Sequence, residues 1–99
     1  MFDLEMYRSS VAELCRDLSV KRLEYVGSAS RGDFDSESSD IDVLIQFEGD
    51  EGLFDRYFAL KFGLERIFGR KVDVIQDGAV RNPHLRASLD QDRMAVYEA

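Results

Sequence analysis

Residues 40–47, with the sequence DIDVLIQF, constrain the fold more than any other part of this chain. Polar and apolar side chains alternate there, which is typical of a strand with one buried face. Four apolar side chains would share one face: Ile41, Val43, Ile45 and Phe47. The opposite face would carry Asp40, Asp42, Leu44 and Gln46. A strand of this kind needs a sheet that is covered on one side, so the rest of the chain must supply the covering helices.

Apolar residues that recur at spacings of three and four predict helices over residues 3–18 and 53–68. Asn82 followed by Pro83 is typical of an N-cap and a first-turn proline, and predicts a third helix over about residues 83–90. These helices are candidates for the layer that covers the apolar face of the sheet.

Short apolar runs predict strands over residues 22–27 and 71–76, and an edge strand over residues 93–98. Residues 28–39 are rich in Ser, Gly and Asp and are expected to form a loop. Because strands and helices alternate, we expect an α/β (α+β) fold with a mixed sheet of about four strands and helices packed on one face.

Length and composition limit the possible functions. A chain of 99 residues has room for one core, so residues 1–99 are expected to form one domain. The 20 acidic and 13 basic side chains give a net charge of −7, which disfavours direct binding of nucleic acid or of a membrane surface. No apolar run is long enough to span a membrane, and no leader is visible. The single cysteine, Cys15, is expected to be a buried small hydrophobe, and we expect a cytoplasmic protein.

Three carboxylates are candidates for chemistry. Asp40 and Asp42 would project from the same strand face, where their like charges repel unless a cation binds between them. Asp73 lies between two valines in the strand predicted over residues 71–76. If the two strands pair, the three acids converge and can hold two Mg²⁺ ions, an arrangement that suits phosphoryl or nucleotidyl displacement.

A glycine- and serine-containing turn precedes this acidic strand, with the sequence GSASRG over residues 27–32. Gly27 lets the backbone approach a ligand closely, and Ser28 offers a hydroxyl donor to a phosphate. Arg31 can form a forked contact to phosphate oxygens. Either motif alone is weak, but the two in this order on strand, loop and strand indicate a nucleotide site.

A resemblance to the polymerase-beta-type nucleotidyltransferase superfamily lies in the stretch VGSASRGDFDSESSDIDVLIQF. The length of the chain and its end, RNPHLRASLDQDRMAVYEA, resemble the minimal nucleotidyltransferases (MNT) of that superfamily. The resemblance implies that Gly27 and Ser28 grip the triphosphate of ATP, with Arg31 assisting. It also implies that Asp40, Asp42 and Asp73 bind Mg²⁺, and that Asp73 helps to deprotonate the acceptor hydroxyl. Eleven residues separate Ser28 from Asp40, one more than is usual in this family.

Minimal nucleotidyltransferases resemble the antitoxins of two-gene modules whose toxin is a helical HEPN-domain ribonuclease. The resemblance therefore implies transfer of AMP from ATP to a tyrosine of such a toxin. An antitoxin that neutralises the toxin by stoichiometric binding, with little or no chemistry, is the alternative. A nucleotidyltransferase for antibiotics or other small molecules is a third possibility, which the missing acceptor domain disfavours. A homo- or hetero-oligomer is compatible with each.

Phe54, Phe58 and Phe62 follow one another at i, i+4 and i+8 on the helix predicted over residues 53–68. Apolar helix stripes usually face a core, so core packing is the favoured interpretation. The same helix carries a second apolar stripe, however, and one sheet face does not need both. An exposed patch for the toxin or for a second copy therefore remains open. The four tyrosines and His84 are interpreted as structural or solvated residues.

Overall fold

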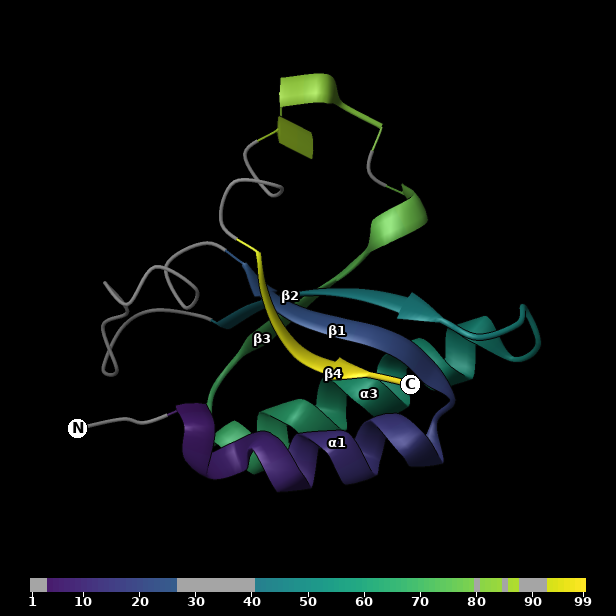
Figure 1. The fold of residues 1–99 in the computed structure, drawn as a ribbon. Helices are drawn as coiled ribbons and strands as arrows, with labels where there is room; N and C mark the ends of the chain where they lie inside the picture. The colour runs from purple at the N-terminus through teal and green to yellow at the C-terminus, as the bar shows by residue number, and fades with distance from the viewer. Residues whose placement is uncertain (1–3, 27–40, 80, 85, 88–92) are drawn as a thin grey trace.

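The computed structural model describes residues 4–26, 41–79, 81–84, 86–87 and 93–99. Its helical elements are the short 3₁₀ turns η1 (Leu4–Tyr7) and η2 (Asp77–Ala79), and the helices α1 (Arg8–Asp17) and α3 (Leu53–Phe68). Its strands are β1 (Val20–Val26), β2 (Ile41–Phe47), β3 (Val72–Gln76) and β4 (Met94–Glu98). Figure 1 shows α1 and α3 on one side of the sheet, which confirms the expected α+β fold.

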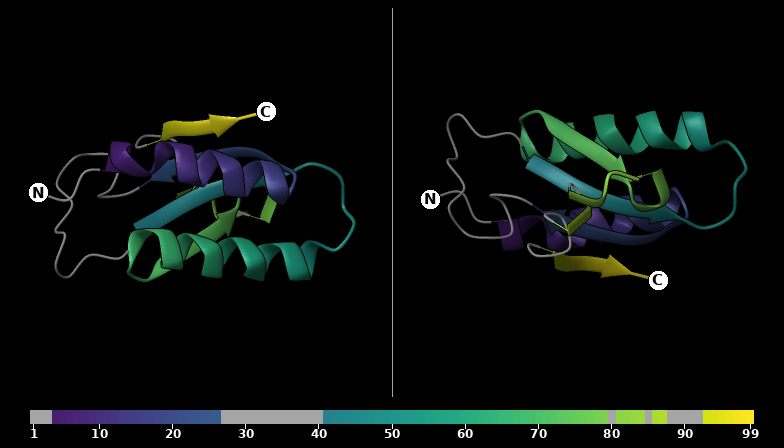
Figure 2. Two further views of the ribbon diagram at one scale, coloured as in Figure 1. Left: turned by 90° about the horizontal axis from the view of Figure 1, so that it is seen from below. Right: turned by 90° about the horizontal axis from the view of Figure 1, so that it is seen from above.

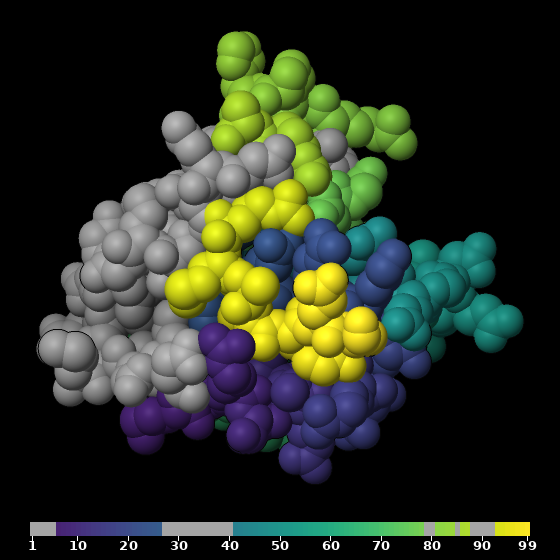
Figure 3. All heavy atoms as spheres, viewed as in Figure 1, coloured from purple at the N-terminus to yellow at the C-terminus, as the bar shows by residue number. Residues whose placement is uncertain are grey.

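The four strands form one mixed sheet in the order β3-β2-β1-β4. β1 pairs antiparallel with β2 and with β4, whereas β2 and β3 are parallel and are joined through α3. The predicted edge strand is therefore present as β4. On the molecular surface β4 lies next to α1 (Figure 3), and Arg8 Nη1 of α1 donates a hydrogen bond to Val96 O at 3.1 Å.

The predicted alternation in β2 sets the position of the core. Ile41, Val43 and Ile45 are at most 1% exposed and pack against apolar residues of α1 and α3. Leu60 and Leu64 of α3 are fully buried in the same cluster. Figure 2 shows the two helices side by side beneath the strands. The other face of β2 carries the polar residues Asp42 and Gln46 and also Leu44, which is buried in a second, small apolar cluster.

Gly63 of α3 packs tightly against α1. A Cβ atom at Gly63 would lie 2.7 Å from Leu14 Cδ2 of α1, which is closer than side chains approach one another. Cys15 of α1 is fully buried, and burial raises the pKa of its thiol to about 12. The interpretation of Cys15 as a small core residue is thereby confirmed.

Two predicted helices differ from the observed ones at their boundaries. The helix expected over residues 3–18 begins with a 3₁₀ turn and becomes α-helical at Arg8. Of the helix expected over residues 83–90, positions 83, 84, 86 and 87 are helical, and residues 85 and 88–90 lie outside the described residues. The N-cap role of Asn82 is confirmed, because its Oδ1 accepts a hydrogen bond from the His84 N–H at 2.9 Å.

The favoured interpretation of the phenylalanine stripe is wrong. Phe54 is 75% exposed and Phe62 is 56% exposed, while Phe58 between them is half-buried. Only the stripe of α3 that contains Leu60 and Leu64 packs into the core against the sheet. The aromatic stripe is left on the surface because a helix that rests on a single sheet face can bury only one side there.

Candidate active site

Asp42 and Asp73 lie side by side on the sheet face that α1 and α3 do not cover, which we call the open face. They are register partners in the parallel pair of β2 and β3. Their neighbours Ile41, Val43 and Val72 point into the core, so the two carboxylates project to the opposite side. Asp42 is half-buried and Asp73 is exposed. The pairing on which the predicted convergence of these acids depended is therefore present.

This pair offers the ligand chemistry that a hard divalent cation requires. Both carboxylates are the second residue of their strands, and parallel strands bring them to the same end of the sheet. Adjacent strands are about 4.8 Å apart, so two such side chains can reach one ion. Oxygen ligands from carboxylates are those that Mg²⁺ prefers, and a cation removes the repulsion between them. The residues therefore fit a magnesium site.

The other predicted site residues, Gly27, Ser28, Arg31 and Asp40, lie outside the described residues. Val26 and Ile41, which border that stretch in the chain, are described. Val26 is the register partner of Asp42 on β1, and Ile41 directly precedes Asp42. Within the part of the chain that the structure describes, no group of three potential metal ligands gathers.

An apolar strip follows Asp42 and Asp73 along the open face. Leu44 of β2 pairs with Ile75 of β3 and with Glu24 of β1, one row further along the strands. Val26 and Leu44 are at most 1% exposed, and Ile75 packs against them as a second, small apolar cluster. Asp42 and Asp73 thus lie next to a small buried apolar cluster on the open face.

A network of four charged side chains lies beyond this strip, and the sequence analysis missed it. Arg93 Nε and Nη2 donate to Glu24 Oε1 at 3.0 and 2.5 Å, and Arg93 Nη2 also contacts Asp77 Oδ2 at 3.2 Å. Arg86 Nη1 pairs with Asp77 Oδ1 and donates to Asp77 O at 3.0 Å. The network ties the segment after β3 to the sheet, and Figure 1 shows that segment rising from the open face. Glu24 is only 8% exposed, and an acid between apolar residues of a strand was the available signal.

The strand that carries Asp73 is held in place by α3. Three outward backbone groups of β3, at the edge of the sheet, are bonded to α3 side chains. Tyr57 Oη donates to Val74 O at 2.9 Å, Lys61 Nζ donates to Val72 O at 2.6 Å, and Glu65 Oε2 accepts from the Val72 N–H at 3.2 Å. The Val72 N–H, aided by Lys61, holds the pKa of Glu65 below its ordinary value. These contacts fix the edge strand, and with it the position of Asp73 in the sheet.

No helix within the described ranges is long and apolar enough to cross a membrane.

Comparison with known proteins places the chain among nucleotidyltransferases. Residues 8–96 match the family model described as nucleotidyltransferase domain. Several proteins of Methanocaldococcus jannaschii named "putative protein adenylyltransferase" are similar in sequence. One is 37% identical over 78% of this chain and 77% of its own length, and another is 31% identical over 93% of this chain and 92% of its own length.

Solved structures agree with this result. A structure described as a "putative minimal nucleotidyltransferase" has a TM-score of 0.77 and 31% identity, and the match covers 92% of this chain and 90% of that one. A toxin–antitoxin complex with AMP-PNP has a TM-score of 0.74 at 18% identity, over 93% of this chain and 73% of that one. A complex of a tri-AMPylated Shewanella oneidensis HEPN toxin with its MNT antitoxin has a TM-score of 0.67 at 15% identity, over 96% and 72%. At 18% and 15% identity, the likeness to these two complexes shows a shared fold only. Because the family model matches residues 8–96, which is nearly the whole chain, this chain belongs to the nucleotidyltransferase domain family.

Proposed function

We propose that this chain is a magnesium-dependent nucleotidyltransferase that transfers AMP from ATP to a tyrosine hydroxyl of a HEPN-domain toxin, and so acts as the antitoxin. The observation that carries the proposal is the pair Asp42 and Asp73, register partners on the open face of a nucleotidyltransferase sheet. The relatives named as protein adenylyltransferases support a protein acceptor. The toxin–antitoxin complexes of the same fold support a HEPN partner and an adenine nucleotide.

Each proposed site residue has a role in this reaction. Asp40, Asp42 and Asp73 are proposed to hold Mg²⁺, with two ions as the expected number, and Gly27, Ser28 and Arg31 to hold the triphosphate. Bound Mg²⁺ would neutralise phosphate charge and lower the pKa of the acceptor hydroxyl. Asp73 is proposed to accept the tyrosine proton, and its exposure supports this role. The tyrosine oxygen forms the bond to the α-phosphorus, the bond from that phosphorus to the bridging oxygen breaks, and pyrophosphate leaves.

The charge of the chain favours a protein acceptor over a nucleic acid. A net charge of −7 repels a phosphate backbone, whereas it attracts a basic protein surface. The single buried cysteine accords with a reducing, cytoplasmic setting. Stoichiometric neutralisation without chemistry remains the competing function, and the experiment below separates the two.

The test is transfer of AMP to the product of the neighbouring gene, measured by intact mass after incubation with ATP and Mg²⁺. We expect the parent to add one or more AMP masses and Asp42→Asn to lose at least a hundredfold in rate, since a metal ligand is removed. Asp17→Asn is the matched control, because Asp17 is an exposed acid at the end of α1. If the parent binds the partner and adds no mass, the catalytic proposal is wrong and stoichiometric binding replaces it.

A further inference from the structure

Three phenylalanines form a row on α3, which we call the aromatic ridge: Phe54 and Phe62, which are exposed, and Phe58 between them, which is half-buried. Their rings contact one another along the helix, with centroids 4.9 Å apart between Phe54 and Phe58 and 5.9 Å apart between Phe58 and Phe62. Phe54 and Phe62 rank with Met6 as the large hydrophobic side chains most exposed in the described part of the chain. Single exposed apolar residues are ordinary, but a contiguous aromatic row on a small acidic domain indicates a contact surface.

The aromatic ridge lies on the β3 side of α3. Gly63 packs against Leu14, so this part of α3 faces α1. Lys61 and Glu65 of α3 bond to the outer edge of β3. Phe58 directly follows Tyr57, and Phe62 directly follows Lys61. Each phenylalanine is therefore about 100° further around the helix than a residue that contacts β3. The ridge therefore points away from α1, past the edge of the sheet formed by β3. A protein seated on it lies next to the strand that carries Asp73.

The β3 edge beside the ridge does not invite an added strand. Val72 N, Val72 O and Val74 O, which point outward, are already bonded to Glu65, Lys61 and Tyr57. These occupied groups disfavour backbone pairing at this part of β3, so we expect a partner to dock through side chains. Aromatic anchors at i, i+4 and i+8 suit the groove between two helices of a partner, in the manner of a helix laid into a groove.

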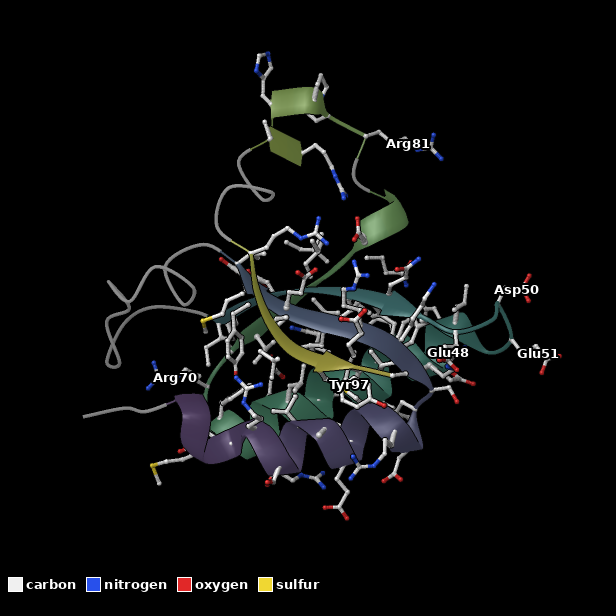
Figure 4. The ribbon with its side chains drawn as sticks, in the orientation of Figure 1. Glu48, Asp50, Glu51, Arg70, Arg81 and Tyr97 are labelled. Carbon is white, nitrogen blue, oxygen red and sulfur yellow. The ribbon has the colours of Figure 1, made fainter. Side chains whose placement is uncertain are left out.

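Charge distinguishes between possible occupants. Asp55 is an exposed acid that directly follows Phe54 on α3. Three further exposed acids, Glu48, Asp50 and Glu51, lie in the turn before α3 (Figure 4). This acidic end of α3 favours a partner whose groove is rimmed by Lys and Arg. A second copy would bring another net charge of −7 and a second convex ridge.

We infer that the aromatic ridge is the docking surface for the acceptor protein of the proposed reaction, a helical protein with an apolar groove rimmed by basic residues. The inference rests on the proposed function, since it identifies the partner with the acceptor. Docking there holds the acceptor beside β3, from which a tyrosine can reach the open face at Asp73. The ridge thus supplies binding energy at a distance from the reacting atoms.

The test compares Phe54→Ser/Phe62→Ser with the parent in binding the product of the neighbouring gene, by calorimetry. We expect the double variant to bind at least tenfold more weakly, because two exposed aromatic anchors are lost. Met6→Ser is the matched control: Met6 is 72% exposed on η1, away from the ridge, and its replacement should leave the dissociation constant unchanged. Circular dichroism and the affinity for Mg²⁺ and ATP should be equal for all three proteins.

Unchanged binding by the double variant would overturn the inference, as would a parent that does not bind this partner. A parent that sediments as a dimer and becomes monomeric on Phe54→Ser/Phe62→Ser would identify a second copy as the occupant and also overturn it. The proposed function fails separately, if the parent binds the partner through the ridge and transfers no AMP. Binding measured by calorimetry therefore tests the docking surface, and the intact mass of the partner tests the proposed catalysis.

Discussion

Arg56 shows how much of this fold can depend on one side chain. From α3 its guanidinium donates to Leu18 O at 2.9 Å, Ser19 O at 2.7 Å, Glu48 O at 2.9 Å and Glu51 O at 3.0 Å. It also lies over the Phe47 ring, 4.5 Å from the centroid. The turn before β1 and the turn after β2 are thereby joined to the start of α3. Arginine suits this position because its planar fork offers five donors and also stacks on an aromatic face.

At the residue scale we predict that Arg56→Lys destabilises the protein by about 1–3 kcal/mol, because an ammonium group can neither fork between these carbonyls nor stack on the ring. The free energy of unfolding from urea titration is the measurement. Arg66→Lys is the control, since Arg66 is an exposed arginine on the same helix. Equal values for the two variants would show that the Arg56 contacts contribute nothing beyond charge.

At the element scale, α3 and β3 act as one unit. The helix covers the core side of the sheet through Leu60 and Leu64, and its flank binds the β3 edge through Tyr57, Lys61 and Glu65. An open edge strand is a site for unwanted pairing with other chains, and side chains that occupy its backbone groups prevent this. The same contacts hold the strand on which Asp73 is presented.

The Glu65 contact makes part of this stability depend on pH. Hydrogen bonding from the Val72 N–H lowers the pKa of Glu65 in the folded state below its ordinary 4.5. The contribution of ionised Glu65 to the free energy of unfolding is therefore complete at pH values above 4.5. It is lost as the pH falls through the lowered pKa. We predict that the parent loses more unfolding free energy between about pH 6 and pH 3 than Glu65→Gln does. Chemical denaturation across this range measures the difference, with Glu13→Gln on α1 as the control; parallel curves for parent and Glu65→Gln would contradict it.

At the scale of the whole molecule, the parallel pairing of β2 and β3 through α3 brings together acids that are distant in the chain. Asp42 and Asp73 become register partners by this crossover. Two adjacent carboxylates repel each other, and a cation bound between them removes that repulsion. A ligand that binds only the native state then adds stability by mass action.

We therefore predict that Asp73→Asn without ligand is at least as stable as the parent, because the repulsion from Asp42 is removed. Mg²⁺ with a non-hydrolysable ATP analogue should raise the melting temperature of the parent by several degrees and that of Asp73→Asn much less. Differential scanning fluorimetry measures both, and Asp50→Asn should respond like the parent. Equal shifts for the parent and Asp73→Asn would count against a metal site at Asp73.

Local patterns in the sequence were sufficient for the elements and for the face of each strand. The period of residues 53–68 predicts α3 with its observed bounds, and the alternation in residues 40–47 places Asp42 away from the core. Such patterns are reliable because burial against one layer imposes a fixed period on the side chains. The predicted strand boundaries are less accurate. β1 begins at Val20 rather than at residue 22, because a register shift against β2 between Val20 and Arg22 disturbs the alternation there.

The sequence alone determined an α+β domain with carboxylates on one strand face, since periodicity and residue chemistry are local properties. Only the tertiary structure decided which carboxylate lies next to which, because strand order depends on pairing between distant segments. It likewise exposed Phe54 and Phe62, because a helix with two apolar stripes can bury only the one that meets the sheet. The contacts of Arg56 and the ion pair of Glu24 with Arg93 were likewise decided only by the tertiary structure. Their partners are far apart along the chain and become neighbours only when the fold is complete.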